Sequence, residues 1–367
     1  MSSGIPLRSR ARYHIKLGCT TDLREDVIDY FLKTMLRAVG RTAVVLLMWL
    51  PVAAWGPACF AEEAEWRHQL PSEVQDRILW FGDLEEGALS DWSAPNEAMA
   101  GGGVFNTGQE DVLAETTTEI VHSGRYSALT RITNAFQSRN GNRAVRLMRW
   151  TDKPWNEGGK MFPAAAYYSV WAYFPESYDP RKYGDWDPGD GGWWSIFQFK
   201  ANDDNGVSQQ IFGFGVDSNQ AKRSMELTLY SNYNSPHSFS PIKPALIRTR
   251  KWVHLEAYYE RSVRNQGVVK FWLDGQLVFD ISGVRTILTT RHDYAVWGIG
   301  NYTDHIEGGR SDGEATIYFD DAAVSTVRLS EHARFSTIPR RGRQSLRPSD
   351  AIPRLPTIPF QATPSRQ

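Results

Sequence analysis

Three short runs of alternating side-chain character, joined by a tight turn, constrain the fold of this chain more than any other stretch. Residues Trp252–Glu260 and Val268–Leu273 alternate with period two, and Asp274-Gly275 leads directly into a third run, Gln276–Ile281. Asp-Gly between alternating runs is a strong hairpin signal, because glycine takes the positive φ that a tight primed turn needs. The stretch predicts antiparallel strands with one face on a core and one face in solvent.

The predicted solvent face of these strands is rich in aromatic and polar side chains. Sugar rings stack their C–H faces on aromatic planes, so a sheet face of this kind suits carbohydrate binding. The alternative is that the aromatic side chains pack beneath a second sheet. The predicted members of this face are Trp252, Tyr258 and Trp272, with His254, Glu256 and Lys270 beside them.

Composition indicates a globular protein built mainly from strands. The 367 residues include 14 Trp and 15 Tyr, and both types are enriched in β-strands. The formal net charge of −1 gives no support for a nucleic-acid partner. We expect an all-β protein that does not bind nucleic acid.

An apolar segment near the N-terminus has the features of a secretory signal peptide. Arginines precede the apolar run 42–55, and small residues lead to Ala61. The run is too short and too interrupted by proline for a membrane span. We expect a signal peptide over residues 35–61, cleaved after Ala61, and a secreted or periplasmic bacterial protein with no membrane span in the mature chain. Residues 1–34 are interpreted as an upstream extension from a misassigned start.

The remaining chain divides into a polar lead-in, one domain and a tail. Residues 62–77 are polar, strand and turn signals alternate over 78–329, and residues 330–367 are rich in Arg and Pro. We expect the tail to be disordered, because it holds too little apolar material to offset the entropy of ordering. Both cysteines, Cys19 and Cys59, precede the predicted cleavage site, so the mature chain would contain no disulfide.

The predicted domain carries many short strand signals and no long helix. A unit of this size made of short strands is typical of a sandwich or barrel. The predicted fold is an all-β jelly roll of two antiparallel sheets, and we expect a monomer. The predicted strands are Ile78–Phe81, Ser127–Ile132, Ala144–Met148, Ala166–Phe174, Trp193–Lys200, Gln210–Asp217, Met225–Tyr230, Trp252–Glu260, Val268–Leu273, Gln276–Ile281, Ala295–Gly300 and Ala315–Val324.

Several motifs follow one another along this domain in a recognisable order. They are LWFGDLEEGALSDW at 79–92, VHSGRYSA at 121–128, YYSVWAYFP at 167–175, SIFQFK at 195–200, the hairpins of 251–282 and IYFDDAAV at 317–324. In this order they resemble concanavalin-like jelly rolls, and within these the polysaccharide lyase branch that includes heparin lyase I and the glucuronan and alginate lyases. The resemblance covers residues 78–329 and is more specific for the fold than for the activity. It implies an enzyme that cleaves a uronic-acid-containing polysaccharide by β-elimination.

Three strand motifs of such lyases are kept only in part. An Arg-x-Glu-x-Arg strand corresponds to Asn142–Arg146, which has arginines and no Glu. A Gln-x-His pair corresponds to Gln198–Lys200, with Lys in place of His. A Tyr-x-Lys-x-Gly-x-Tyr strand corresponds to Val296–Tyr302, which keeps only the Gly-x-Tyr end. The matches fit a diverged active site or the remains of one.

The surviving residues offer groups for β-elimination, which must neutralise the sugar carboxylate, remove the C5 proton and protonate the leaving oxygen. Arg146 and Arg143 are candidates for the carboxylate, with Gln198 as an added amide donor. Strand alternation favours Arg146, because Arg143 shares its face with apolar residues. Tyr302 is the natural proton carrier beside these cations, and Lys200 is a base if it is desolvated. The alternative is a polar sheet face with a packed tyrosine.

Two histidines are alternative bases, because His titrates closest to neutrality. His254 lies in the middle of an alternating strand, and His305 lies in the loop that follows Tyr302. The alternatives are a structural histidine in the strand and a solvated side chain in the loop.

The loop 179–194 combines Pro, Gly and Asp with large aromatic residues. Such a loop beside a sheet face would stack sugar rings or close over a chain, and the alternative is a plain surface connection. Its candidate substrate-binding residues are Tyr183, Trp186, Trp193 and Trp194.

Four carboxylates lie in or beside the first and last predicted strands. In this fold class these strands often pair, which would bring Asp83 and Glu85 close to Asp320 and Asp321. Carboxylate oxygens suit a structural Ca²⁺ ion. The alternative is a strand pair without metal.

The sequence therefore predicts a secreted polysaccharide lyase whose partner is an extracellular, anionic polysaccharide. A non-catalytic carbohydrate-binding protein and a glycoside hydrolase are the alternatives. A hydrolase needs two carboxylates about 5–10 Å apart, and the Glu-x-Asp-x-x-Glu strand of retaining jelly-roll glucanases is missing from the sequence.

Overall fold

The structure is a computed structural model that describes most of the predicted domain and its lead-in. The described residues are 66–93, 100–133, 135, 141–178, 194–219, 224–303 and 314–332. The chain divides into two compact units, 1–61 and 62–367, and every described residue belongs to the second. The predicted upstream extension and signal peptide, and nearly all of the predicted tail, therefore lie outside the described residues. Among those described, no helix is long and apolar enough to cross a membrane.

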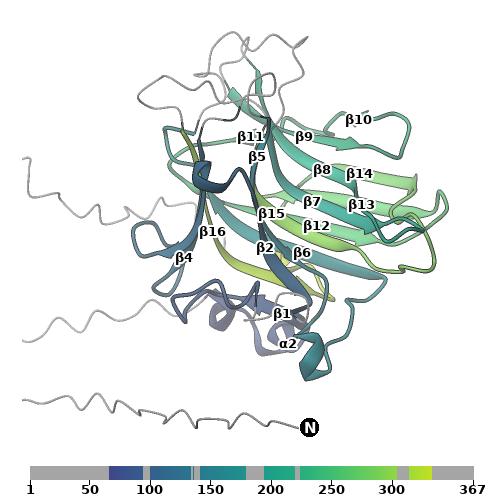
Figure 1. Ribbon diagram of the computed structural model, residues 1–367, viewed down its shortest axis with the longest axis horizontal. Coiled ribbons are helices and arrows are strands. Elements are labelled where there is room, and N and C mark those ends of the chain that lie inside the picture. The colour runs from purple at the N-terminus through teal and green to yellow at the C-terminus, as the bar shows by residue number, and fades with distance from the viewer. Residues whose placement is uncertain are drawn as a thin grey trace, which may run out of the picture. The chain divides into compact units, whose positions relative to one another are not determined.

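Two antiparallel sheets, each of eight strands in the described part of the chain, form a jelly-roll sandwich (Figure 1). Sheet A has the spatial order β14 (Gln276–Val284), β13 (Gly267–Leu273), β12 (Trp252–Glu260), β6 (Ala165–Tyr173), β16 (Glu314–Ser325), β4 (Ser127–Thr133) and β3 (Val112–Thr117), with β1 (Ile78–Gly82) paired to β16. Sheet B has the order β10 (Ser238–Phe239), β9 (Ser224–Ser231), β8 (Ser208–Asn219), β7 (Trp194–Asn202), β15 (Val296–Thr303), β5 (Arg143–Arg149) and β2 (Gly102–Thr107), with β11 (Leu246–Ile247) paired to β9. The predicted all-β jelly roll is confirmed.

Short helical segments flank the sheets. They are η1 (Trp66–Gln69), α2 (Ser72–Gln75), η2 (Gln109–Asp111), η3 (Trp155–Glu157) and η5 (Leu329–Glu331). Strands β2, β3, β10 and β11 were not predicted. Strand β2 begins with two glycines and β3 contains Ala and Glu, all of them depleted in strands, while β10 and β11 are too short to show a period.

The hairpin that the alternation predicts is present in sheet A. Strands β12, β13 and β14 pair consecutively, and Leu273 lies opposite Gln276 across the turn. Asp274 and Gly275 have φ values of 49° and 76°, as a primed turn requires.

The space between the sheets is filled by aromatic rings from both layers. Phe199 of sheet B stacks on Tyr259 of sheet A with ring centroids 3.9 Å apart. Phe197 meets Phe271 edge to face at 5.3 Å. This packing fixes the face of each strand, because side chains that alternate with the buried rings must point outward.

The outer face of sheet A is partly covered, so the prediction of a solvent-exposed aromatic face is wrong for its centre. His254 and Glu256 are fully buried and Trp272 is 5% exposed. The covering side chains come from η1, α2, η5 and the link between η1 and α2. They are Trp66, Leu70, Val74 and Leu329, and they form a second apolar cluster with Trp171 and Ala323. The alternative, aromatic residues beneath a second sheet, is correct about burial and wrong about the cover, which consists of short helical segments.

Glu256 makes the stability of this cover dependent on pH. Its carboxylate accepts the backbone N–H of Leu329 at 2.7 Å and of Ser330 at 3.3 Å. Burial nevertheless raises the pKa of Glu256 to about 7. Because the folded pKa lies above the unfolded value, the stability from this group is present at low pH and lost as pH rises through about 7.

We expect the free energy of unfolding to fall by on the order of 3 kcal/mol between about pH 5 and pH 8 through Glu256 alone. Glu256→Gln should remove this slope, measured by urea unfolding across that range. Glu260→Gln, on the same strand, is the matched control and should keep it. Parallel pH curves for wild type and Glu256→Gln would contradict the prediction.

Candidate active site

Strands β5 and β7 of sheet B present predicted site residues on the outer face of that sheet. Val145 and Leu147 are buried in the core between the sheets, so Arg146 points outward. Lys200 on β7 likewise lies between the buried core residues Phe199 and Ala201 and points outward.

Gln198 and Tyr302 lie on the same outer face. Gln198 is 4% exposed and is flanked by the core residues Phe197 and Phe199. On β15, the Asn301 side chain donates to the Ala315 carbonyl of sheet A at 2.7 Å, so Asn301 points inward. Tyr302 therefore points outward, and the four central predicted residues share one face.

Arg146 and Tyr302 are in direct contact. The Arg146 guanidinium carbon lies 5.1 Å from the centre of the Tyr302 ring. Asn142 Nδ2 donates to the Tyr302 hydroxyl at 3.2 Å. Arg146 Nη2 donates to Thr107 Oγ1 at 2.9 Å. These contacts fix the phenol and the guanidinium as neighbours.

The two cations of this face are desolvated. Burial lowers the pKa of Arg146, and burial together with the nearby Arg146 charge lowers the pKa of Lys200. Arg146 Nε is buried without a hydrogen-bond partner. Within the described residues neither cation forms an ion pair with a carboxylate. The arrangement favours binding of an anion.

Glycines leave room above the centre of this face. A Cβ at Gly298 would lie 3.2 Å from Met148 and 3.3 Å from Gln198, and one at Gly300 would collide with the Val145 carbonyl. Larger residues at these positions would cover Gln198 or push the strands apart.

Sequence reasoning missed three polar residues that complete the face. Tyr230 on β9 accepts a hydrogen bond from Gln210 Nε2 on β8 at 2.7 Å. Ser195 on β7 also forms a hydrogen bond with Tyr230. Their strands were predicted, but no motif marked these residues.

Two predicted substrate-binding residues lie elsewhere. Arg143 points inward and binds Asp111, with its Nη2 2.7 Å from Oδ2. Trp194 is 3% exposed and packs against Tyr178 in the core. These placements correct the prediction: the guanidinium already has a carboxylate partner, and the indole has no surface for a sugar.

His254 lies on sheet A, beneath the cover formed by Trp66. It is fully buried, and burial lowers its pKa to about 3, helped by the nearby His122. A histidine in this position does not share a face with Tyr302, so its prediction as a base is corrected. The other candidates, His305, Tyr183, Trp186 and Trp193, lie outside the described residues.

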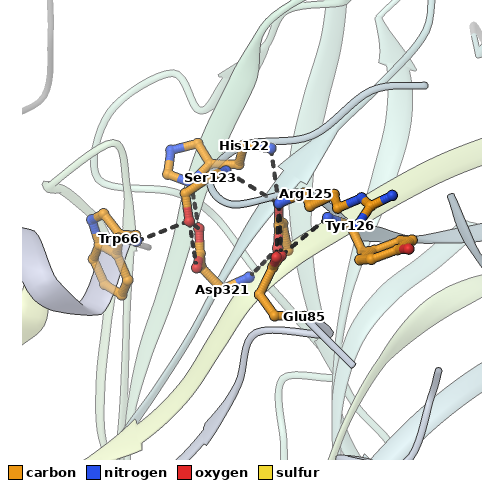
Figure 2. Close-up of polar contacts among 8 residues, drawn as sticks. Trp66, Glu85, His122, Ser123, Arg125, Tyr126 and Asp321 are labelled. Carbon is orange, nitrogen blue, oxygen red and sulfur yellow. Dashed lines mark hydrogen bonds and ion pairs between the residues drawn. The ribbon is translucent and has the colours of Figure 1, made fainter. Parts of the chain in front are cut away.

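The predicted acidic residues hold the loop 122–126 (Figure 2). Strands β1 and β16 pair as predicted. Asp320 accepts the backbone N–H of His122 at 2.8 Å, and Asp321 accepts the Ser123 hydroxyl at 2.8 Å. Glu85 accepts the backbone N–H of Arg125 at 2.8 Å and of Tyr126 at 3.0 Å, as the dashed lines in Figure 2 show.

These acidic residues do not converge on one point. Asp83 accepts the N–H of Glu85, and the oxygens of Glu85, Asp320 and Asp321 face N–H and O–H protons rather than a shared space. In the described part of the chain no group of three or more His, Cys, Asp or Glu side chains is arranged to hold a metal ion. The donor set does not fit Ca²⁺, which therefore stays a prediction without support from this geometry.

The fold and the site define a jelly-roll protein whose sheet B presents two desolvated cations and a tyrosine on one face. Residues 84–323 match the family described as polysaccharide lyase, and the chain belongs to that family. No curated protein matches the chain.

Solved structures with a similar arrangement include an endo-β-1,4-glucuronan lyase from the fungus Trichoderma reesei, with 15% identity, coverage of 68% of this chain and 96% of that chain, and a TM-score of 0.46. Alginate lyase Aly36B has 14% identity, 68% and 97% coverage and a TM-score of 0.42. The cellulose induced protein Cip1 has 14% identity, 68% and 97% coverage and a TM-score of 0.40. Likeness at this level carries no information about substrate.

Proposed function

We propose that the protein is a secreted lyase that cleaves a uronic-acid-containing polysaccharide by β-elimination on the outer face of sheet B. The observation that carries the proposal is the pair Arg146 and Lys200, which are desolvated on one face with no carboxylate partner among the described residues. Arg146 also lies against the Tyr302 ring. Uncompensated cations on one face favour an anionic polymer. The signal-peptide pattern of residues 35–61 supports secretion.

Each residue of this face has a separate role in the proposed elimination. Arg146 and Gln198 bind the sugar carboxylate and stabilise the charge that develops when C5 loses its proton. The Lys200 amine takes that proton once it has lost its own, and burial and Arg146 make that loss easier by lowering its pKa. The electron pair of the C5–H bond forms the C4–C5 double bond as the C4–O bond breaks. The Tyr302 hydroxyl gives its proton to the leaving oxygen.

A panel of anionic polysaccharides incubated with the purified protein tests the proposal. The unsaturated product absorbs in the ultraviolet, so a rise in absorbance on at least one polymer is expected. New reducing ends without absorbance would show hydrolysis instead. Binding with neither signal would show a carbohydrate-binding protein, the reading that the partly kept motifs leave open.

The proposed base predicts a specific pH dependence. Activity should rise with pH as the Lys200 ammonium loses its proton, below the ordinary lysine pKa of about 10.4, because burial and Arg146 lower that pKa. Lys200→Arg keeps a positive charge that does not titrate and should lose activity at every pH. Lys251→Arg, a surface substitution, is the control. An unchanged pH profile in Lys200→Arg would exclude Lys200 as the base.

A further inference from the structure

A second phenol stands on the outer face of sheet B, and the mechanism above does not use it. Tyr230 on β9 lies opposite Gly213 on β8 in the strand register. A Cβ at position 213 would overlap the Tyr230 ring carbon Cζ and its hydroxyl, as well as the Gln210 amide. The Tyr230 ring therefore occupies the space that a side chain at position 213 would need.

The Tyr230 hydroxyl is fixed from two sides. Gln210 Nε2 donates to it at 2.7 Å, which occupies a lone pair and leaves the phenolic proton for another acceptor. The Tyr230 hydroxyl is also hydrogen-bonded to Ser195, the direct register partner of Tyr302. The chain Gln210–Tyr230–Ser195 therefore ends beside the proposed proton donor.

The surroundings of the Tyr230 hydroxyl change its pKa in opposite directions. Burial raises the pKa of Tyr230, the hydrogen bonds from Ser195 and Gln210 lower it, and a charge on Tyr302 raises it again. A negative charge on Tyr302 therefore favours the protonated form of Tyr230.

Resting on the proposed function, we propose that Tyr230 is a positioning residue for Tyr302. Held by Gln210 above Gly213, it directs hydrogen-bond donors through Ser195 toward the negative charge that Tyr302 carries after it has protonated the leaving oxygen. Gly213 is required for this arrangement, because any side chain at position 213 would displace the Tyr230 phenol.

A double-mutant cycle tests the proposal. Tyr230→Phe and Gln210→Met should each lower kcat about 10- to 100-fold with little change in KM, the effect of one hydrogen bond to a charged group. The double variant should be no worse than either single variant, because both remove the same contact. The alkaline limb of the pH profile should move to higher pH, since the Tyr302 phenolate loses stabilisation.

The matched control is Tyr233→Phe, a tyrosine that is 40% exposed, with kcat unchanged. Thermal unfolding of every variant shows whether the fold is kept. Additive losses in the double variant, or a fixed alkaline limb, would overturn the role of Tyr230 while leaving the lyase assignment intact. A wild-type protein inactive on every polymer would instead overturn the proposed function. In that case the Tyr230 resonance of protein labelled at tyrosine Cζ, assigned through Tyr230→Phe, should still shift in Gln210→Met, and an unshifted resonance would overturn the contact itself.

Discussion

Tyr302→Phe is expected to lower kcat at least about a hundredfold, the usual contribution of a positioned proton donor. The substitution removes only the hydroxyl and keeps the ring against which Arg146 lies, 5.1 Å from its centre. Polymer binding should therefore persist while the ultraviolet signal disappears. The measurement is the initial rate of absorbance increase on the best polymer of the panel.

The control for Tyr302→Phe is Tyr258→Phe, which removes a hydroxyl from the outer face of sheet A. It should leave the rate unchanged. A Tyr302→Phe variant with the rate of the wild type would exclude the phenol as the proton donor and would move attention to residues outside the described ranges.

Asp321→Ala is expected to cause the largest loss of stability. Asp321 is fully buried, its Oδ2 lies 2.6 Å from His122 Nδ1, and it accepts the hydroxyl of Ser123 (Figure 2). Removing this acceptor leaves the buried Ser123 hydroxyl and the partly buried His122 ring without their partner, at a cost of about 1–3 kcal/mol for each group. Asp321 also has a φ of 46°, a conformation that alanine tolerates poorly. At about 2–4 °C per kcal/mol, the unfolding midpoint should fall by roughly 10 °C.

Asp321→Asn distinguishes the two causes of the lower stability, which are the lost carboxylate contacts and the positive φ. Asparagine tolerates a positive φ and keeps an acceptor for Ser123, so its midpoint should lie between those of the wild type and Asp321→Ala. Lys270→Ala breaks the exposed ion pair with Asp280 and should change the midpoint little. A midpoint for Asp321→Ala equal to that of the wild type would mean that the loop 122–126 does not depend on this carboxylate.

Strand positions were predictable because alternation and turn chemistry are local. Asp274-Gly275 specifies its own turn, and period two alone placed Arg146 outward and Arg143 inward. Alternation does not say what lies above a face, so His254 was assigned to solvent although a distant segment carrying Trp66 covers it.

A bulge explains the two errors on β7. Counted back from Gln198 with strict alternation, Trp194 falls on the outer face and Ser195 on the inner one. The register shifts between Ser195 and Phe197, so the two residues exchange faces. Trp194 enters the core, and Ser195 reaches Tyr230. A single inserted residue of this kind leaves no mark in the sequence.

The predicted grouping of the carboxylates was correct only in part. Pairing of the first and last strands was anticipated correctly, and it does bring the acids near one another. Their partners are backbone N–H groups and side chains of a loop between strands β3 and β4, and contacts between segments so far apart in sequence have no local pattern.

Arg146 and Lys200 also destabilise the protein when no polymer is bound, because their positive charges repel each other. Two like charges held together out of water oppose the folded state, and a bound polyanion relieves that repulsion. Substrate should thus act as a thermal protectant, with the melting temperature climbing as polymer is added and the gain fading in concentrated salt.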